Sequence, residues 1–318
     1  MAAPTVSVVI PVHNRTGDLT TLLAQLNAQH TLDFEVVVVD DGSSPPVCES
    51  IRPEFYRFKL VLLRRETCGG IGAARNRGVR AASSDLILFV DSDSQVLDPE
   101  YIEKHTANCR QGVPALGIAP GNPFVLHGRV IGIHSTYAGY SFGYSNWFVS
   151  CMPRARTIED HHVPANNTCV SRDVFDRVGL FDEGLEVAED IDFAFRCRKL
   201  GVPLVYVPDL PLHHADRDSF RDLWRSFVKM GEFAWRVHES HPGSPYRYCY
   251  PFNRVTGWLY FLPLSVLLTV YIVGRWLASG DLRVLFYVPG IHFANVAYCV
   301  GVCKALRAAG SRHAPSSG

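Results

Sequence analysis

Short hydrophobic runs alternate with helical periodicity along the first part of the chain. Leucines three and four residues apart predict a helix over residues 18–29, and an alanine-rich segment predicts another that begins at Ala73. Uninterrupted β-branched, apolar runs predict strands at residues 6–12, 34–39, 59–63 and 86–90. Strands that are apolar on both faces need cover on both sides, so the pattern predicts an α/β fold with a mainly parallel sheet and helices on both faces.

The periodicity weakens in the middle of the chain. Residues 110–165 are rich in Gly, Tyr, Phe, Asn and His, and we interpret them as a less regular segment. Beyond it the pattern predicts short helices at 173–178 and 189–200, a strand at 202–207, an amphipathic helix at 217–237 and a linker at 241–252.

Two uncharged stretches, residues 255–274 and 284–303, lie near the C-terminus between basic residues. About twenty apolar residues cross the hydrocarbon core of a bilayer. The stretches therefore predict a hydrophobic helical hairpin that spans a membrane or lies in its interface. Pro263, Pro289, His292 and Asn295 weaken this interpretation, and the alternative is a helix pair in a soluble domain or a dimer interface.

Composition narrows the setting. Lysine plus arginine equals aspartate plus glutamate, at 31 each, which gives no support to nucleic-acid binding. The nine cysteines are scattered and none lies in a CxxC pair. No secretory signal is visible before the first strand. We therefore expect a catalytic portion in the reduced cytosol, at the cytoplasmic face of the cell (inner) membrane.

Acidic residues follow two of the predicted strands. Ligands of parallel sheets bind beyond the carboxyl ends of the strands, so these residues are expected to share one site. Asp91 and Asp93 offer the hard oxygen ligands that suit Mg²⁺ or Mn²⁺. Asp41 offers an acceptor for the N–H of a nucleobase. Each of these two acidic motifs, taken alone, is also typical of an ordinary turn that ends a strand.

A glycine-rich turn precedes the second predicted helix. Its N–H groups, with Arg75 or Arg77, are suited to neutralising phosphate. The sequence Gly70-Ile71-Gly72 also has a weak similarity to a dinucleotide fingerprint, with Asp91 as a ribose ligand.

Three acidic residues open the helix predicted at 189–200. Such residues suit the positive end of a helix dipole, and Asp190 is also a candidate general base. His213 and His214 are expected to follow a strand and a proline-containing loop, where one of them is a candidate metal ligand.

Taken in order, these segments resemble the family 2 glycosyltransferases. The resemblance covers most of residues 5–214 and rests on VSVVIPVHNR, VVVVDDGSS, GGIGAARNRG, LILFVDSDS, NNTCVSRDVFDRVGLFDE and EDIDFAFRCRKLG. It implies a Rossmann-like GT-A fold, an inverting single displacement, and a UDP-, GDP- or dTDP-linked sugar donor. It also implies Asp190 as the catalytic base, Asp93 and His214 as ligands of Mn²⁺ or Mg²⁺, and a donor site formed by Pro11, Asn14, Asp41, Gly70, Arg75, Asp91 and Glu189.

The resemblance and the two uncharged C-terminal stretches together define the domains and the acceptor that we expect. We expect a catalytic domain at 1–245, a membrane-associated helical segment at 246–306 and a basic, flexible tail at 307–318. The QxxRW motif of processive synthases is missing, so we expect transfer of one sugar to a lipid-linked or cell-envelope glycan, with residues 110–165 shaping the acceptor pocket. An NAD-dependent oxidoreductase and a non-catalytic sugar-nucleotide-binding or scaffold protein are the alternatives.

Overall fold

The computed structural model describes residues 3–159, 161–241 and 254–312, which divide into two compact units. The sheet unit contains Met1–Ile131 and Met152–Ala215, and the helical unit contains Gly132–Cys151 and Asp216–Gly318. The domain boundary expected at residue 245 lies outside the described residues.

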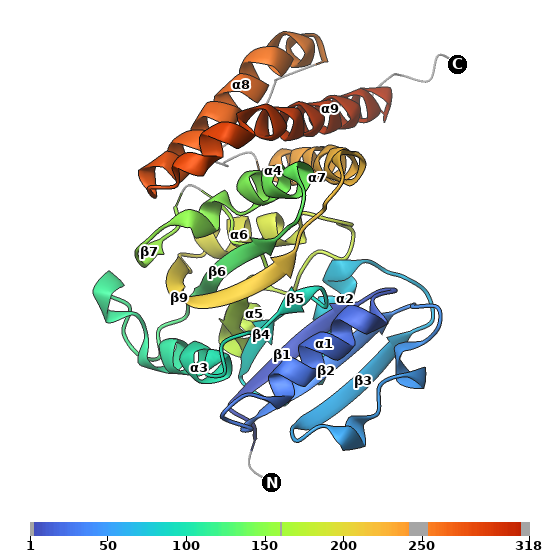
Figure 1. Ribbon diagram of the computed structural model, residues 1–318, viewed down its shortest axis with the longest axis vertical. Helices are drawn as coiled ribbons and strands as arrows, with labels where there is room; N and C mark the ends of the chain where they lie inside the picture. The colour runs from blue at the N-terminus through green and yellow to red at the C-terminus, as the bar shows by residue number, and fades with distance from the viewer. Residues whose placement is uncertain (1–2, 160, 242–253, 313–318) are drawn as a thin grey trace. The chain divides into compact units, whose positions relative to one another are not determined.

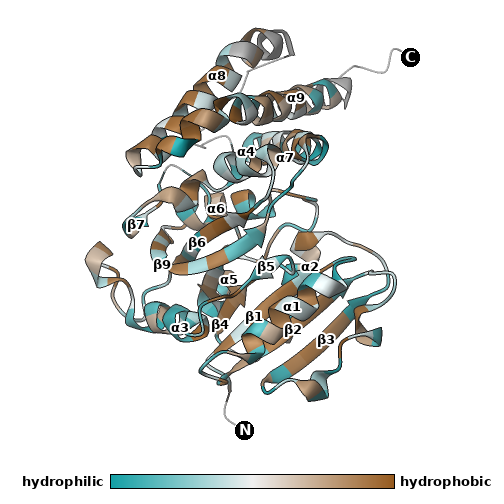
Figure 2. Ribbon diagram, viewed as in Figure 1, coloured by the Kyte–Doolittle hydropathy of each residue, from teal (hydrophilic) through white to brown (hydrophobic). Residues whose placement is uncertain are grey.

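The sheet unit is built on four parallel strands (Figure 1). Strand β1 pairs with β2 on one side and with β4 on the other, and β3 extends the sheet beyond β2. Figure 2 shows β1, β2 and β3 as largely hydrophobic, in agreement with the runs that predicted them. The bounds of these strands are β1 Val6–Val12, β2 Phe34–Asp41, β3 Lys59–Arg65 and β4 Leu86–Phe89.

Helices cover both faces of these strands. Alternate residues of a strand point to opposite faces. Val6, Val8 and Ile10 share a core with the buried leucines of α1 (Thr16–Asn27). Val9 points the other way, toward Gly78 of α2 (Ile71–Ala81). The predicted α/β arrangement, with helices on both faces of the sheet, is therefore confirmed.

Beyond β4 the sheet becomes antiparallel. Strand β8 (Thr168–Ser171) pairs antiparallel with both β4 and β6 (Val125–Ile133). Strand β9 (Leu204–Ala215) follows β6 in the sheet and pairs antiparallel with β5 (Ser94–Gln95) and β7 (Arg156–Thr157). The full order is β3-β2-β1-β4-β8-β6-β9-β5, with β7 attached to β9.

Two expectations from the sequence were wrong. Residues 110–165 are more regular than expected, because they include the strand β6 and the helix α4 (Tyr137–Asn146). Strand β9 continues past Pro208 and Pro211, so His213 and His214 lie within a strand and do not follow a loop. The remaining elements of the sheet unit are α3 Tyr101–Gln111, α5 Arg172–Val178, α6 Glu189–Lys199 and the 3₁₀ turns η1 Val47–Glu49, η2 Pro53–Phe55 and η3 Pro114–Leu116.

The helical unit has its own hydrophobic contacts. Helix α9 (Val288–Arg312) packs against α4, α7 (Phe220–Ser240) and α8 (Arg254–Ala278). The 3₁₀ helices η4 (Phe148–Cys151) and η6 (Leu282–Tyr287) complete the unit. Among the described residues, the stretch Leu282–Ala308 is long and apolar enough to cross a membrane. Its apolar 18-residue window has a mean hydropathy of 1.4 and is 44% buried. The apolar part of α8, Pro263–Ala278, is shorter.

Gly78 should be intolerant of any side chain, because a Cβ there would lie 2.3 Å from Cγ1 of Val9. We expect Gly78→Ala to lower the free energy of unfolding by about 1–3 kcal/mol through overpacking. Gly17 in α1 is the matched control, since its Cβ would meet no atom within 4 Å. Gly17→Ala should be neutral or stabilising by up to about 1 kcal/mol. Equal urea midpoints for the two variants would contradict this packing.

Glu35 should make the stability of the sheet unit depend on pH. Burial raises the pKa of this carboxyl, but hydrogen bonds from Lys59, Ser7 and Ser83 outweigh it and lower the pKa from 4.5 to about 2. A carboxylate with a lowered pKa stabilises the fold above its unfolded-state pKa, and this contribution is lost as pH falls toward the folded-state pKa.

We expect Glu35→Gln to cost about 1–3 kcal/mol near neutral pH. The difference from the parent should shrink as pH falls from about 4.5 to about 2, in urea unfolding at several pH values. Exposed Glu54, changed to Gln, is the control and should show little difference at any pH. A pH-independent loss in Glu35→Gln would argue against a charged Glu35.

Candidate active site

Asp91, Asp93 and His214 gather at the carboxyl end of the parallel strands. Asp91 and Asp93 lie between β4 and β5, and His214 lies on β9 directly opposite Ser94 of β5. Each offers one ligand atom, and these atoms all lie within 4.8 Å of one another. Nε2 of His214 is 3.2 Å from Oδ1 of Asp93, and both side chains are about nine-tenths buried. The strand pairing therefore brings together residues far apart in the sequence.

These ligand atoms fit one divalent cation. Ligands at about 2.1 Å from an octahedral ion lie roughly 3–4.2 Å from each other, which is compatible with the spacing of this group. Two carboxylates and one imidazole suit Mn²⁺ or Mg²⁺ and leave coordination positions for water or a phosphate. Arg15, whose Nη1 is 3.7 Å from Oδ2 of Asp93, provides a nearby positive charge that the sequence analysis did not single out.

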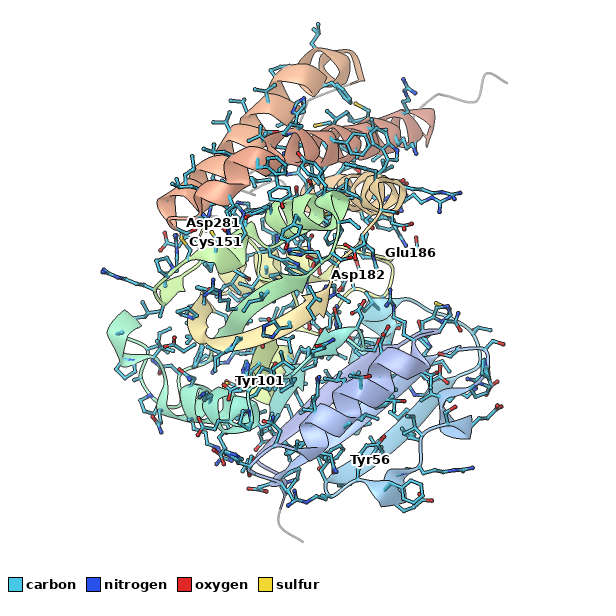
Figure 3. The ribbon with its side chains drawn as sticks, in the orientation of Figure 1. Tyr56, Tyr101, Cys151, Asp182, Glu186 and Asp281 are labelled. Carbon is cyan, nitrogen blue, oxygen red and sulfur yellow. The ribbon has the colours of Figure 1, made fainter. Side chains whose placement is uncertain are left out.

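Two consecutive asparagines bind the end of β4 and the loop that follows it. Oδ1 of Asn166 accepts hydrogen bonds from the N–H of Asp91 (3.0 Å) and the hydroxyl of Ser94 (3.3 Å). Asn167 is fully buried, and its amide donates to two carbonyls while its Oδ1 accepts from the hydroxyl of Tyr101. Tyr101 is labelled in Figure 3. Our sequence analysis did not identify this support; the adjacent Asn-Asn pair was its only signal.

Arg75 links the carboxylates of two different segments. Its guanidinium is 3% exposed and forms ion pairs with Asp91 (2.8 Å) and with Glu189 at the start of α6. Burial lowers the pKa of Arg75, but the negative charges of Asp91, Glu189 and Asp190 raise it by more. The net effect is a raised pKa. Burial and the charge of Asp190 raise the pKa of Glu189 to about 7, although Arg75 opposes this. Arg75 is thus directed at carboxylates, and Arg77 is exposed.

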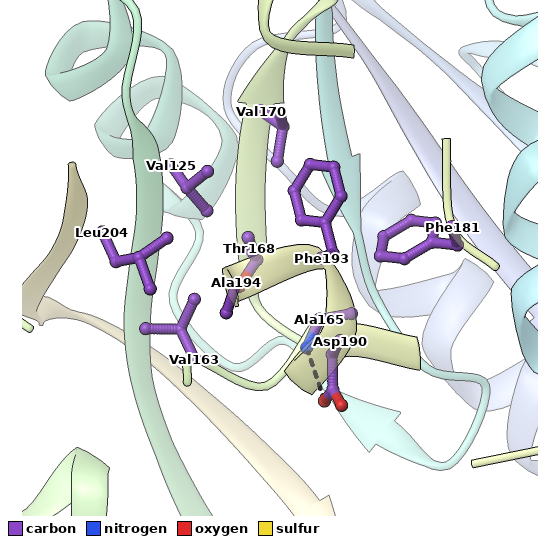
Figure 4. A pocket seen from close by; sticks show the side chains of 10 residues that line it. All are labelled: Val125, Val163, Ala165, Thr168, Val170, Phe181, Asp190, Phe193, Ala194 and Leu204. Atoms are coloured by element: carbon purple, nitrogen blue, oxygen red, sulfur yellow. Dashed lines mark hydrogen bonds between the residues drawn. The ribbon is translucent and has the colours of Figure 1, made fainter. Parts of the chain in front are cut away.

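Asp190 lies at the start of α6, beside a small hollow of the sheet unit (Figure 4). Its Oδ2 accepts a 3.4 Å hydrogen bond from the N–H of Ala165, drawn as the dashed line in Figure 4. Ala188 precedes this turn with a φ of +69°, a left-handed conformation that costs an alanine roughly 1 kcal/mol. The backbone thus adopts an unfavourable conformation to start α6 where Glu189 meets Arg75.

The glycine-rich turn surrounds the carboxylate of Asp41. The N–H groups of Gly69 and Gly70 donate to it at 2.9–3.1 Å, and Nε of Arg65 lies 3.2 Å from Oδ1. The sequence predicted that these N–H groups bind phosphate. In the structure their hydrogen bonds go to Asp41 instead. Asp41 lies at the end of β2 and is about 5% exposed.

Asn14 and Pro11 complete this side of the site. Pro11 is buried in β1 opposite Val39, while Asn14 follows β1 with a φ of +55°. Oδ1 of Asn14 accepts the N–H of Ser44, and its own N–H donates to Ser43. The structure therefore forms two groups: Asp91, Asp93, His214, Arg75 and Glu189 around the candidate metal site, and Asn14, Asp41 and Gly70 around the turns after β1 and β2.

Comparisons with known proteins identify the class to which this fold and site belong. The family model of glycosyl transferase family 2 matches residues 7–122, and that of glycosyl transferase family group 2 matches residues 86–301. The chain belongs to the family 2 glycosyltransferases, as the sequence motifs indicated.

Individual relatives agree with this class. The validoxylamine A glucosyltransferase of Streptomyces hygroscopicus is 32% identical over 224 residues, 63% of this chain and 53% of that protein. The pre-mycofactocin glycosyltransferase of Mycobacterium tuberculosis is 30% identical over 242 residues, 74% of this chain and 48% of that protein. This chain thus spans only about half the length of these curated relatives.

Solved structures share the fold. The mannosyltransferase PcManGT of Pyrobaculum calidifontis, in complex with GDP-Man and Mn²⁺, has a TM-score of 0.61 at 15% identity and covers 96% of this chain and 88% of its own. S. aureus TarS 1-349 with UDP has a TM-score of 0.52 at 18% identity, over 98% of this chain and 92% of its own. The predicted GT-A fold is confirmed.

Removing a candidate metal ligand should weaken cation binding. We expect Asp93→Asn and His214→Ala each to lower Mn²⁺ affinity at least tenfold in calorimetric titration, because each removes one ligand atom of the group. Asp98→Asn, which alters a carboxylate that lies outside the ligand group and binds Lys104 and the N–H of Glu100, is the control and should keep the parent affinity. Unchanged Mn²⁺ affinity in both ligand variants would place the cation elsewhere.

Proposed function

We propose that this protein is a metal-dependent, inverting glycosyltransferase that moves one sugar from a nucleotide-sugar donor to a lipid-linked or cell-envelope glycan. The observation that carries the proposal is the ligand group of Asp91, Asp93 and His214 at the carboxyl end of the parallel strands. Arg75 connects this group to the start of α6, where Asp190 lies. A cation that stabilises the leaving diphosphate and a carboxylate base that activates the acceptor are two parts that suit a direct displacement at a sugar carbon.

The residues have separate roles in the proposed reaction. Asp91, Asp93 and His214 would hold Mn²⁺ or Mg²⁺, which offsets the charge of a diphosphate leaving group. Asp190 accepts the proton of the acceptor hydroxyl as its oxygen bonds to the anomeric carbon. The bond from that carbon to the diphosphate oxygen breaks on the opposite face, so configuration inverts. Arg75, held between Asp91 and Glu189, keeps the cation-binding loop and the start of α6 in place.

The donor is proposed to be a UDP-, GDP- or dTDP-linked sugar. Two neighbours of the same fold support this class, since one is a complex with GDP-Man and the other with UDP. The acceptor is less constrained by the relatives, whose names include validoxylamine A glucosyltransferase, O-antigen biosynthesis protein and dolichol-phosphate mannosyltransferase. Two of these names fit an acceptor in the cell envelope or on a lipid.

Membrane attachment through the C-terminal segment is part of the proposal. The stretch Leu282–Ala308 has the length and apolar composition of a helix that can enter a membrane. With balanced charge and no basic excess, nucleic acid is not a proposed partner. We place the enzyme at the cytoplasmic face of the cell membrane, where an acceptor on a lipid would be within reach.

The oxidoreductase alternative loses its main support. It depended on the glycine turn, whose Gly69 and Gly70 N–H groups donate to Asp41. The family to which the chain belongs is one of glycosyltransferases. A non-catalytic sugar-nucleotide-binding protein is the remaining alternative, and kinetic tests of Asp190 distinguish it.

Asp190→Asn should separate binding from catalysis. First, calorimetry with UDP, GDP, dTDP and NAD, each with and without Mn²⁺, should find one nucleoside diphosphate that binds only with the cation. Asp190→Asn should keep that affinity within about twofold and reduce sugar transfer, or hydrolysis of the matching nucleotide sugar, by at least a hundredfold, because no carboxylate is left to accept the proton.

Asp192→Asn is the matched control for this variant. Asp192 lies in the same first turn of α6, but its carboxylate pairs with Arg196. It should keep most of the turnover, because Asp192 is not the proposed base. Both changes remove one negative charge near the same helix dipole, so the comparison isolates the proton-accepting role of Asp190. Equal turnover in the two variants would refute Asp190 as the base, and metal-independent NAD binding without diphosphate binding would refute the proposed function.

A further inference from the structure

The outer face of α8 is apolar although it is exposed. Its large side chains are 36–72% exposed and repeat at helical spacing: Leu259, Val266, Leu267, Val270, Tyr271 and Leu277. The described residues between them on this face, Pro263, Gly274 and Ala278, are exposed and uncharged as well. Water-exposed helix faces are normally polar or charged. This face therefore has the opposite character to that of an ordinary surface helix.

Two described polar residues of α8, Ser265 and Thr269, point inward instead. Ser265 is fully buried and Thr269 is 6% exposed. The hydroxyl of Thr269 accepts a 3.0 Å hydrogen bond from Nδ2 of Asn295 on α9 and lies 3.2 Å from Nδ1 of His292. Polar residues between helices and apolar residues outside are typical of helices surrounded by lipid. His292 and Asn295, which weakened the membrane interpretation of the sequence, thus belong to the inside of the helix pair.

Helix α9, which belongs to the stretch long and apolar enough to cross a membrane, is covered on several sides. A Cβ on Gly301 would lie 2.0 Å from the carbonyl oxygen of Val228 on α7, so the two helices are in close backbone contact. None of the large hydrophobic side chains described in α9 is exposed. On the far side, α7 exposes charged residues, namely Arg221, Asp222, Arg225, Lys229 and Arg236. With charged α7 packed along it, α9 is not free to cross a bilayer as a single helix.

The apolar surface continues beyond the end of α8 into η6. Leu282, Leu285 and Phe286 are 55–70% exposed there. Arg283 is exposed among them and pairs with Asp281, so its charge lies at the margin of the surface. Such a border of arginine beside exposed leucine and phenylalanine suits a helix in the lipid interface.

We propose that the outer face of α8, together with Leu282, Leu285 and Phe286 of η6, lies in the plane of a membrane and contacts its acyl chains. This inference rests on the membrane attachment proposed above and names the surface that makes it. Helix α8 would lie along the bilayer surface, and α9 would stay within the protein.

Lipid fits this surface better than a second copy of the chain. Protein interfaces of ordinary size form about one hydrogen bond per 100–200 Å² of buried surface. On the described outer face of α8, the one hydroxyl is that of Tyr271, and it accepts a 3.0 Å hydrogen bond from Arg275. The other described side chains of this face offer no polar group to a protein partner, whereas acyl chains require none.

The test is flotation of the full-length protein with vesicles of phosphatidylcholine and phosphatidylglycerol. We expect Leu267→Glu/Val270→Glu to reduce vesicle binding at least tenfold, because both side chains are more than three-fifths exposed on the proposed surface. The control is Phe55→Glu/Leu200→Glu, which places the same charges on exposed apolar residues of the sheet unit and should bind as the parent does. Leu267→Ala/Val270→Ala gives a milder variant with a smaller expected loss.

Labelling distinguishes in-plane attachment from a spanning hairpin. Arg283→Cys, bound to preformed vesicles, should react with an impermeant maleimide added outside, as read by peptide mapping that separates it from the native cysteines. Protection of this cysteine would overturn the proposal. Equal vesicle binding by the parent and both α8 variants would also overturn it. The same holds if the parent binds no vesicles and forms a dimer that the α8 variants convert to monomers.

Nucleoside diphosphate binding on the same samples separates this inference from the proposed function. The α8 variants should bind the nucleotide as the parent does. Loss of vesicle binding with intact nucleotide binding supports the surface proposed here, whereas absent nucleotide binding in the parent refutes the proposed function alone.

Discussion

The buried charge of Arg75 constrains the whole sheet unit. An arginine that is 3% exposed is tolerated only if its charge is neutralised. Asp91 and Glu189 provide that neutralisation from two different segments, so the loop after β4 and the start of α6 are fixed relative to α2. The left-handed Ala188 fits this requirement, because its conformation starts α6 where Glu189 meets the guanidinium. Much of the site is thus positioned by a single cation of the protein itself.

The first four strands and the acidic residues after them could be predicted, because both depend on local sequence. Val36 to Val39 are buried on both faces of β2, and such runs have few alternative conformations. Asp91 and Asp93 follow β4 directly, so their place at the sheet edge comes with the strand. The C-terminal apolar helices were also visible in the sequence, since their length and composition do not depend on partners.

Features that depend on distant partners could not be predicted. Helix α4 contains glycine, serine and tyrosine, and its glycines lie against Asp216, Asp218 and His134, so packing rather than propensity explains it. Strand β9 continues through two prolines because other strands pair beside them. The N–H groups of Gly69 and Gly70 were expected to be free, yet they bind Asp41 on β2. Apart from His134, these partners are far away in the sequence.

The short pairing of β5 with β9 has a consequence for biosynthesis. Ser94 lies opposite His214, and the N–H of Ala215 donates to the carbonyl of Asp93, so the cation site joins an early part of the sheet unit to its last strand. A ribosome-bound chain that lacks β9 can form the parallel strands but has only two of the three ligands. At the proposed cation site, binding would therefore follow synthesis of the whole sheet unit, and the bound ion would stabilise only the finished unit.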